Sequence, residues 1–527
     1  MDNLTLPSPS PVVDELGQQV TDEWQSLSPI AILYFVSSVI RQLAGNFIYL
    51  IPALAFSYKS ILQHPFIWLP AIALVLGFLC FFAFLSFKVY RYRLTDNSIE
   101  IRSGVLHKTH LNLPFERVQN VKIEQPIYYR LSGHACLQLD TAGSAKNEAK
   151  LIAIKLEIAQ QLKEKIQQHV VEQTEALPSD TLKNEQIPNK EQLLNKRQLS
   201  DLVIHGITSN RIWILLGGLA PFYDNIISTI ADGLTKIGLD IEGLFSLETH
   251  SFLEVALYAL SLTMLVMLLL VGFSIAGAII SFYGYTLSKL GDKYIRRSGL
   301  LTKHEVSMRL SRLQMIIRKQ DWLDLLLNRI NLKLEQNSSM GQNFDPSARN
   351  SKIIVPSVKP DECHAIIDDA YPNNHLTELI ENKRFLAISR RFIFRKMGLI
   401  YGPILMLAIL VSTFADKYNL VAIFAMSLLL VCGLVVLRWK RWGIAYDQEF
   451  IYVRKGLVGV DYYCFPSFKI QQCQFKQSVM MKGRHLASVK FILASGSVTI
   501  PMIDENLAYQ LIDDSLFQVE NSQQSWM

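Results

Sequence analysis

The sequence predicts an α+β membrane protein in which three pairs of membrane helices alternate with three small β-rich domains. Three observations predict it: apolar runs long enough to cross a bilayer, a motif that recurs three times after those runs, and a two-residue alternation of apolar side chains within the recurrences. Of the 527 residues 50% are hydrophobic, and the mean hydropathy of +0.21 is high for a soluble protein.

Charge and cysteine usage exclude several classes of protein. The net charge of +6 is mild for a nucleic-acid binder, so no nucleic-acid partner is expected. The six cysteines form no C-x-x-C pair, which argues against a disulfide framework or a zinc site. Residues 1–28 contain no Lys or Arg, unlike the basic start of a secretory signal, and we expect residues 1–27 to be a disordered acidic tail.

The membrane segments follow from length, because crossing about 30 Å of hydrocarbon takes about 20 apolar residues. Four charge-free runs meet this requirement, a fifth is shorter, and a sixth is interrupted by Asp224. The four long runs are residues 66–87, 255–288, 397–415 and 420–437. The shorter run is 42–58, and the interrupted run is 212–230. We therefore expect about six transmembrane helices in three hairpins, with Asp224 as a possible polar residue at membrane depth.

Basic residues flank these helices on one side only, whereas the hairpin tips are poor in Lys and Arg. The flanking residues are Lys88, Arg91, Arg93, Arg390, Arg391, Arg395, Lys396, Arg438, Lys440 and Arg441. The positive-inside rule then places the β-rich domains and both termini in the cytoplasm. Each such residue contributes about 1 kcal/mol toward an anionic leaflet, so the lipid bilayer itself is an expected partner.

An internal repeat follows each hairpin, and its copies align without a gap when counted from Gly104, Gly299 and Gly456. An arginine stands at position −2, a basic residue at +13 and a glutamine at +15. The arginines are Arg102, Arg297 and Arg454, the basic residues Arg117, Arg312 and Lys469, and the glutamines Gln119, Gln314 and Gln471. Two interpretations remain open: these side chains close each domain internally, or they contact a partner or lipid.

Each copy continues through strands to a C-terminal amphipathic helix. Apolar alternation and small-residue turns predict antiparallel hairpins, followed by helices around 157–170, 360–370 and 506–516. The predicted membrane hairpins are residues 28–89, 200–284 and 372–438. The predicted β-rich domains are residues 90–170, 285–371 and 439–518. A polar linker is expected at 171–199 and a tail at 519–527.

With these motifs the chain resembles the bacterial pleckstrin-homology-like (bPH2, DUF304-type) membrane-flanked domain family over roughly residues 28–518. The resemblance implies, in each of three PH-like domains, a bent antiparallel sheet of about seven strands with a C-terminal helix. The middle copy departs most, with Arg309 where its siblings have proline and a helix-like stretch from Trp322. Eukaryotic relatives bind phosphoinositides through basic residues of the first hairpin. Here those turns, residues 95–98 and 447–449, lack Lys and Arg, so no specific phosphoinositide is expected.

No motif points to catalysis. A P-loop, a G-x-S-x-G elbow, H-E-x-x-H and a dinucleotide fingerprint are all missing, and His107-x-x-His110 is interpreted as two surface histidines. We expect no enzyme, no cofactor and no metal. The sequence favours a membrane-anchored scaffold that binds partner proteins or the inner leaflet and self-assembles, as a homo-oligomer or with a companion PH-like membrane protein, in an envelope-related role. The alternative is a transporter or export factor, which rests on Asp224 and the 217–221 stretch.

Overall fold

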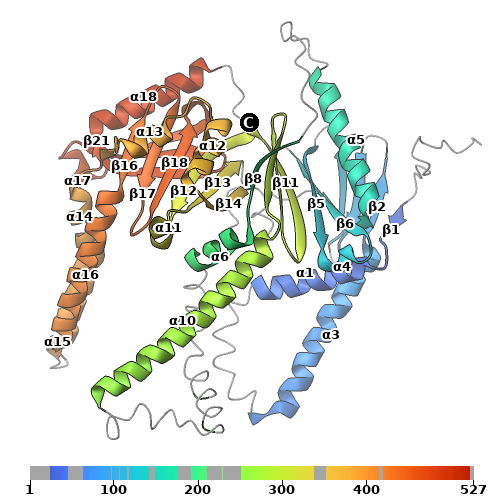
Figure 1. Ribbon diagram of the computed structural model, residues 1–527, viewed down its shortest axis with the longest axis horizontal. Coiled ribbons are helices and arrows are strands. Elements are labelled where there is room, and N and C mark those ends of the chain that lie inside the picture. The colour runs from blue at the N-terminus through green and yellow to red at the C-terminus, as the bar shows by residue number, and fades with distance from the viewer. Residues whose placement is uncertain are drawn as a thin grey trace, which may run out of the picture. The chain divides into compact units, whose positions relative to one another are not determined.

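A computed structural model describes most of the chain, and Figure 1 shows its elements. The described residues are 24–45, 63–95, 98–105, 107–115, 118–141, 149–175, 191–209, 228, 235, 251–336, 352–414 and 419–522. Asp224, Arg117, the 212–230 segment apart from residue 228, and most of the 42–58 run therefore lie outside them. The chain divides into two compact units, which we describe one at a time.

The first unit contains the first copy of the repeat. Its four-stranded antiparallel sheet has the order β1-β2-β3-β4. The strands are β1 (Gln25–Ser26), β2 (Arg91–Leu94), β3 (Ser98–Ser103) and β4 (Thr109–Pro114). Between β1 and β2 the chain forms α1 (Ala31–Gly45) and the long apolar helix α3 (Pro65–Val89). Leu27 and Ala31 are buried in the core of this copy, so the chain ahead of the hairpin is part of the domain.

The second sheet of this copy contains β5 (Val118–Pro126), β6 (His134–Thr141) and β7 (Ala149–Lys155), and helix α5 (Leu156–Glu175) follows it. The short helix α4 (Ile127–Arg130) connects β5 to β6. The outer edge of β5 pairs with Thr302–Glu305, the first four residues of β11 (Thr302–Arg309), which belong to this unit. The first sheet of the second copy thus begins against the second sheet of the first copy.

The second unit contains the rest of copy two and all of copy three. Copy two begins with β8 (Gln192–Lys196), α6 (Leu199–Thr208), β9 (Thr286–Leu290) and β10 (Lys293–Ser298), where helix α10 (Phe252–Phe282) precedes β9. It continues with β12 (Leu313–Gln320), α11 (Trp322–Leu326), β13 (Ile330–Gln336), β14 (Lys352–Val358) and α12 (Pro360–Ala370). Its core is lined by the buried Tyr285, Tyr294 and Leu332.

Copy three is built in the same way. It begins with α13 (Leu376–Glu381), β15 (Leu386–Ala387), α14 (Arg391–Lys396), a π-helical turn (Met397–Tyr401), α15 (Gly402–Phe414) and α16 (Asn419–Arg441). It ends with β16 (Gly443–Tyr446), β17 (Phe450–Lys455), β18 (Val460–Pro466), β19 (Ile470–Lys476), α17 (Val479–Lys482), β20 (Leu486–Leu493), β21 (Gly496–Asp504) and α18 (Glu505–Asn521). One seven-stranded sheet joins the two copies in the order β14-β13-β12-β18-β17-β16-β15, whereas β19-β20-β21 form a separate sheet.

The β-hairpins predicted at the start of copies one and three, and the predicted C-terminal helix of copy two, agree closely with the structure. Tyr92 pairs with Ile101 and Ile444 with Val453, as the two-residue alternation predicts. The helix predicted at 360–370 coincides with α12. The middle copy is less divergent than predicted, because the helix that starts at Trp322 has counterparts in α4 and α17 of its siblings.

The predicted domain boundaries need a correction. Each copy starts with a strand before its hairpin (β1, β8 or β15), and that strand pairs with the first strand after the hairpin. The membrane segment is therefore inserted between the first two strands of each domain. Part of the 171–199 linker is strand β8, the end of helix α5 extends into its start, and the first residues of the 372–438 hairpin form α13 and β15. These short strands carry no shared motif, so periodicity could not find them.

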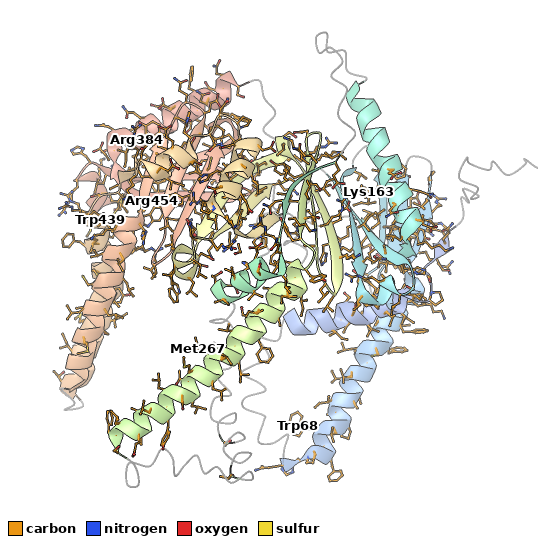
Figure 2. All side chains as sticks on the ribbon, viewed as in Figure 1. Trp68, Lys163, Met267, Arg384, Trp439 and Arg454 are labelled. Carbon is orange, nitrogen blue, oxygen red and sulfur yellow. The ribbon has the colours of Figure 1, made fainter. Side chains whose placement is uncertain are left out.

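Two helices of the described residues are long and apolar enough to cross a membrane, α3 and α10. Only 6% of the most apolar stretch of α3 is buried, so α3 is not the core helix of a soluble domain. The labelled Trp68 and Met267 lie on these two helices in Figure 2. The expected number of six spans is therefore not reached in the part of the chain that the structure describes, although α15 and α16 are apolar helices at two of the predicted positions.

Candidate functional site

The repeated arginine has the same structural task in all three copies. The guanidinium of Arg102 lies 3.8 Å from the ring centre of Trp24, and that of Arg454 lies 5.2 Å from the ring centre of Phe385. Arg297 forms an ion pair with Glu191. Trp24, Glu191 and Phe385 each directly precede the first strand of their copy. The arginine thus holds the strand that enters the hairpin, which supports the structural interpretation of this position.

The basic residue at +13 is described fully in copy three. Lys469 is 4% exposed, and its Nζ donates hydrogen bonds of 2.6 Å to the backbone carbonyls of Ser311 and Leu313 in copy two. Burial lowers the pKa of Lys469 to about 8. This residue therefore connects two neighbouring copies and is not available to an external ligand.

Of the glutamines at +15, Gln314 and Gln471 share no role, whereas the glutamine at +21 has one role in all three copies. Gln314 is buried and Gln471 is exposed. By contrast, the Nε2 atoms of Gln125, Gln320 and Gln477 donate to the backbone carbonyls of His134, Arg329 and Leu486 at 3.2, 3.0 and 3.1 Å. In each copy this bond closes the loop that carries the short helix between the fifth and sixth strands. The glutamine at +21 is present in the sequence of all three copies, six residues after the glutamine at +15.

The repeat glycine is fixed by a tight approach of the backbone. Gly104 and Gly299 have φ angles of +99° and +118°, which disfavour any side chain. A Cβ atom at Gly104 would lie 1.9 Å from the carbonyl oxygen of His107, and one at Gly456 would lie 2.1 Å from that of Gly459. The glycines are therefore required by the turn and not by a ligand.

A cleft of about 510 Å³ in copy three brings three residues of the predicted basic flank together. Arg395 and Lys396 from α14 and Arg438 from α16 line it, and Lys476 at the end of β19 adds a fourth basic side chain. The other lining residues are Phe392, Trp442, Gln477, Ser478, Met481, Ser488, Thr499 and Pro501. No Asp or Glu is among them. The cleft has the charge and the hydroxyl groups to bind an anionic group.

Trp442 lines this cleft and has a buried polar atom. Its side chain is 8% exposed, and its Nε1 atom has no hydrogen-bond partner among the described residues. A buried N–H without a partner costs about 1–3 kcal/mol. The corresponding residues are Tyr90 and Tyr285, of which Tyr90 donates to the carbonyl of Lys150.

The cleft lies beside an apolar tip. Helix α17 presents Val479 and Met480, which are 91% and 87% exposed, and Arg395 contacts Met481 of the same helix. The equivalent helices also expose large apolar side chains, Leu131 next to α4 and Leu326 in α11, at 94% and 74%. Each of these short helices is linked to the element that enters the membrane segment: Tyr128 bonds Ser37 of α1, and Arg329 near α11 pairs with Asp201 of α6.

The remaining predicted flank residues do not join the cleft. Arg93 pairs with Glu100 at 2.9 Å, and Arg390 lies over the ring of Trp439. The labelled Trp439 lies at the sheet end of α16 in Figure 2. The others are at exposed or half-exposed positions next to the helix ends, namely Lys88, Arg91, Arg391, Lys440 and Arg441.

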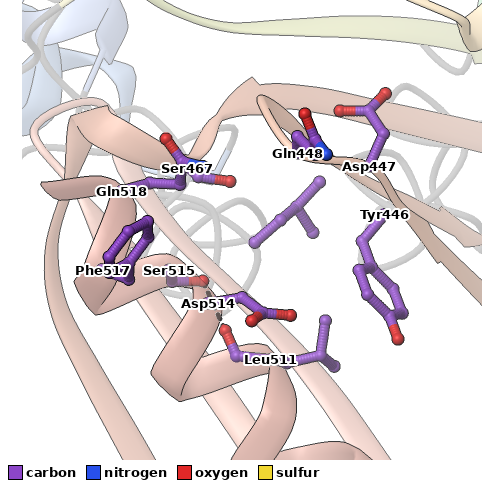
Figure 3. A pocket seen from close by; sticks show the side chains of 10 residues that line it. Tyr446, Asp447, Gln448, Ser467, Leu511, Asp514, Ser515, Phe517 and Gln518 are labelled. Carbon is purple, nitrogen blue, oxygen red and sulfur yellow. Dashed lines mark hydrogen bonds between the residues drawn. The ribbon is translucent and has the colours of Figure 1, made fainter. Parts of the chain in front are cut away.

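A second hollow of copy three is acidic. Figure 3 shows side chains from the β16–β17 turn on one side and from helix α18 on the other, including Asp447 and Asp514. Asp447 is already occupied, because it accepts hydrogen bonds from the backbone N–H groups of Glu449 and Phe450 and from the hydroxyl of Tyr452. This is the turn of the first hairpin, and its carboxylates make it a poor site for a phosphate.

Comparison with known proteins supports the resemblance to the PH-like family. A family model of the bacterial PH domain, bPH_2, matches residues 47–170 and 403–516, which contain most of copies one and three. The chain is also 21% identical over 495 residues to the UPF0699 transmembrane protein YdbT of Bacillus subtilis (strain 168). The matched region covers 90% of this chain and 94% of that protein. The chain is an α+β membrane protein with two regions that match the bacterial PH domain, and along most of its length it is similar to the YdbT transmembrane protein.

Proposed function

We propose that this protein is a membrane-anchored scaffold whose PH-like domains hold the anionic inner leaflet of a bacterial cytoplasmic membrane. The observation that carries the proposal is the cleft of copy three, where four basic side chains and three hydroxyl side chains gather without a carboxylate. An anionic phospholipid head group supplies the acceptors that this cleft lacks. In this proposal six helices cross the membrane, and the domains and both termini are cytoplasmic.

The short helices give the scaffold a second contact with lipid. The apolar side chains at α4, α11 and α17 are too exposed to stabilise the domains, and each helix is tied to an element next to the membrane segment. Large apolar residues beside basic ones are typical of protein surfaces at a membrane interface. We therefore place these tips in the head-group region, where burial of Val479 and Met480 adds to the attraction of the basic residues.

The proposed protein is not an enzyme. The transporter alternative has no support of its own in the described part of the chain, because Asp224 and the 217–221 stretch lie outside it.

The test is retention of lipid by the purified, full-length protein. Native mass spectrometry in mild detergent with added phosphatidylglycerol or phosphatidylcholine should show phosphatidylglycerol bound to the wild type. The double variant Arg395→Gln/Arg438→Gln should lose about tenfold or more in affinity, because each basic contact contributes about 1 kcal/mol.

The matched control removes two charges elsewhere. Lys196 and Lys303 are exposed strand residues outside the cleft, and Lys196→Gln/Lys303→Gln should bind phosphatidylglycerol as the wild type does. Equal losses in the two double variants would mean that net charge alone attracts lipid. No preference of the wild type for phosphatidylglycerol would refute the proposal.

A further inference from the structure

The copies of the repeat are joined in one way at both junctions within the chain. Strand β5 of copy one pairs antiparallel with β11 of copy two, and β12 of copy two pairs antiparallel with β18 of copy three. In each case the second sheet of one copy continues into the first sheet of the next. The junctions are heterologous, since they use two different edges of the domain.

The register of the two junctions is identical. Counted from the repeat glycine of each copy, Glu124 at +20 faces His304 at +5, and Lys319 at +20 faces Asp461 at +5. The two offsets add to 25 for every paired residue at both junctions. Two separate junctions would not share a register unless the edges were complementary at that register.

Side chains reinforce this pairing across copies. Lys469 of copy three binds two carbonyls of copy two, and Lys163 of helix α5 forms an ion pair with Glu305 of β11. A basic residue stands at the position of Lys469 in every copy, including copy one, where it is Arg117. Arg117 thus gives copy one the same type of side chain at this position that Lys469 gives copy three.

The same two edges are unpaired at the two ends of the series. Among the described residues β4 pairs with β3 alone and β19 pairs with β20 alone. All but one residue of β12 are buried, whereas only Ile470 of β19 is buried and three of its seven residues are exposed. An unpaired edge of this length is a template for another strand.

Neither edge carries a bulge or a proline that is missing from the edges already paired. The bulge between β19 and β20 recurs at the same place between β12 and β13, where the edge is paired. Pro114 at the end of β4 has its counterpart in Pro466 of β18, which is also paired. The edges of the end copies therefore have the features of the edges that already form junctions.

We propose that strand β19 of one chain pairs antiparallel with strand β4 of a second copy of this chain, in the register of the internal junctions. The partner strand adds to the free sheet edge by β-augmentation. In that register Cys473 faces Asn112, Phe475 faces His110 and Lys476 faces Thr109. Because the contact is head to tail, it produces a closed ring or an open filament of chains. The inference gives the proposed scaffold its partner, and it depends on the scaffold role but not on lipid binding.

The first test uses the native cysteine. In membranes that contain the full-length protein, Asn112→Cys should form a reducible disulfide with Cys473 of a neighbouring copy under mild oxidation. Bands at twice the mass of the chain and above should increase at least fivefold over the wild type on a non-reducing gel. Asn112 is exposed, so the substitution leaves the fold intact.

Three variants serve as controls. Asn112→Cys/Cys473→Ser removes the expected partner and should return the yield to that of the wild type. His110→Cys moves the thiol by two residues on the same strand and should give a lower yield than Asn112→Cys. Lys319→Cys/Asp461→Cys places two cysteines at the directly paired positions +20 and +5 of an internal junction and should form its disulfide within one chain.

Each contrary result overturns a defined part of the proposal. No crosslink above the wild type, or a crosslink that persists in Asn112→Cys/Cys473→Ser, excludes the β19–β4 contact. If the Asn112→Cys variant forms its disulfide with Cys473 only at the mass of one chain, both edges meet within a single molecule. Equal yields from His110→Cys and Asn112→Cys exclude the proposed register.

The second test reverses a charge at one pair position. At both internal junctions the residues at +20 and +5 pair an acidic side chain with a basic one or with histidine, and at the proposed contact they are Lys476 and Thr109. Thr109→Glu should lower the dissociation constant of the assembly several-fold, and Thr109→Lys should raise it by a similar factor, measured by mass in mild detergent. Equal effects of the two substitutions would contradict the register. If the wild type assembles but shows no preference for phosphatidylglycerol, the lipid proposal alone is refuted.

Discussion

Strands β12 and β19 occupy the same position in copies two and three, yet they have opposite surroundings. Strand β12 has neighbours on both edges, and Met315 and Ile317 on one of its faces are buried against the core of copy three. Strand β19 has a neighbour on one edge, and Gln472 and Gln474 stand at the same two positions. The comparison indicates that copy two is completed by the copy that follows it, and that copy three has no such neighbour among the described residues.

The largest expected effect comes from placing a charge at the equivalent position of the two strands. Ile317→Lys puts an ammonium group where the side chain is 7% exposed and apolar, and should destabilise the second unit by about 3 kcal/mol or more. Gln474→Lys should change its stability by less than about 0.5 kcal/mol. Urea unfolding followed by tryptophan fluorescence measures both. Equal losses would mean that β19 is already covered in the single chain.

A smaller effect is expected at the residue three positions after the repeat glycine. A Cβ atom at Gly459 would lie 2.3 Å from the backbone oxygen of Gln320 in copy two, so Gly459→Val should push the internal junction apart and cost about 1–3 kcal/mol. His107 holds the same position at the free edge and is exposed, so His107→Val should be nearly neutral. Thermal unfolding of the two variants compares a junction that exists within the chain with one that does not.

The smallest effect concerns the pH dependence of the internal junction. The pKa of Lys469 falls from 10.5 to about 8 on folding because burial disfavours the ammonium form. The unfolded chain therefore binds more protons between pH 8 and 10.5, and the free energy of unfolding should rise through this window by up to about 1.4 kcal/mol per pH unit from this residue. Lys469→Met should remove that contribution. An identical pH profile in wild type and variant would show that this lysine is not buried at the junction.

Much of the fold could be predicted because it depends on local patterns. Alternating apolar residues placed the first hairpins at Tyr92 and Ile444, and amphipathic spacing placed the C-terminal helices. The strand before each hairpin was missed, since β1 and β15 are two residues long and are held by backbone pairing and by contacts with Arg102 and Arg454. Such contacts join residues separated by a membrane segment and leave no periodic signal.

The candidate site was predicted only in part. The sequence predicted the basic flank as a set, but it could not show that Arg395, Lys396 and Arg438 meet in one cleft while Arg93 pairs with Glu100. Lys476 and Trp442 were missed, because they reach the cleft from β19 and the end of α16 through tertiary folding. The pairing of one copy with the next also depends on tertiary structure, and its register appears only when both junctions are aligned.

Hydrogen exchange on strands β12 and β19 tests directly whether β19 is a free edge that a second chain covers. In a dilute, monomeric detergent sample, amides of residues 470–476 should exchange much faster than those of 313–320, because β19 lacks a second neighbour among the described residues. At concentrations where the chain assembles, exchange of 470–476 and of 109–114 should slow together, while 313–320 stays unchanged. Slow exchange of 470–476 in the monomer, or no change on assembly, would contradict the account.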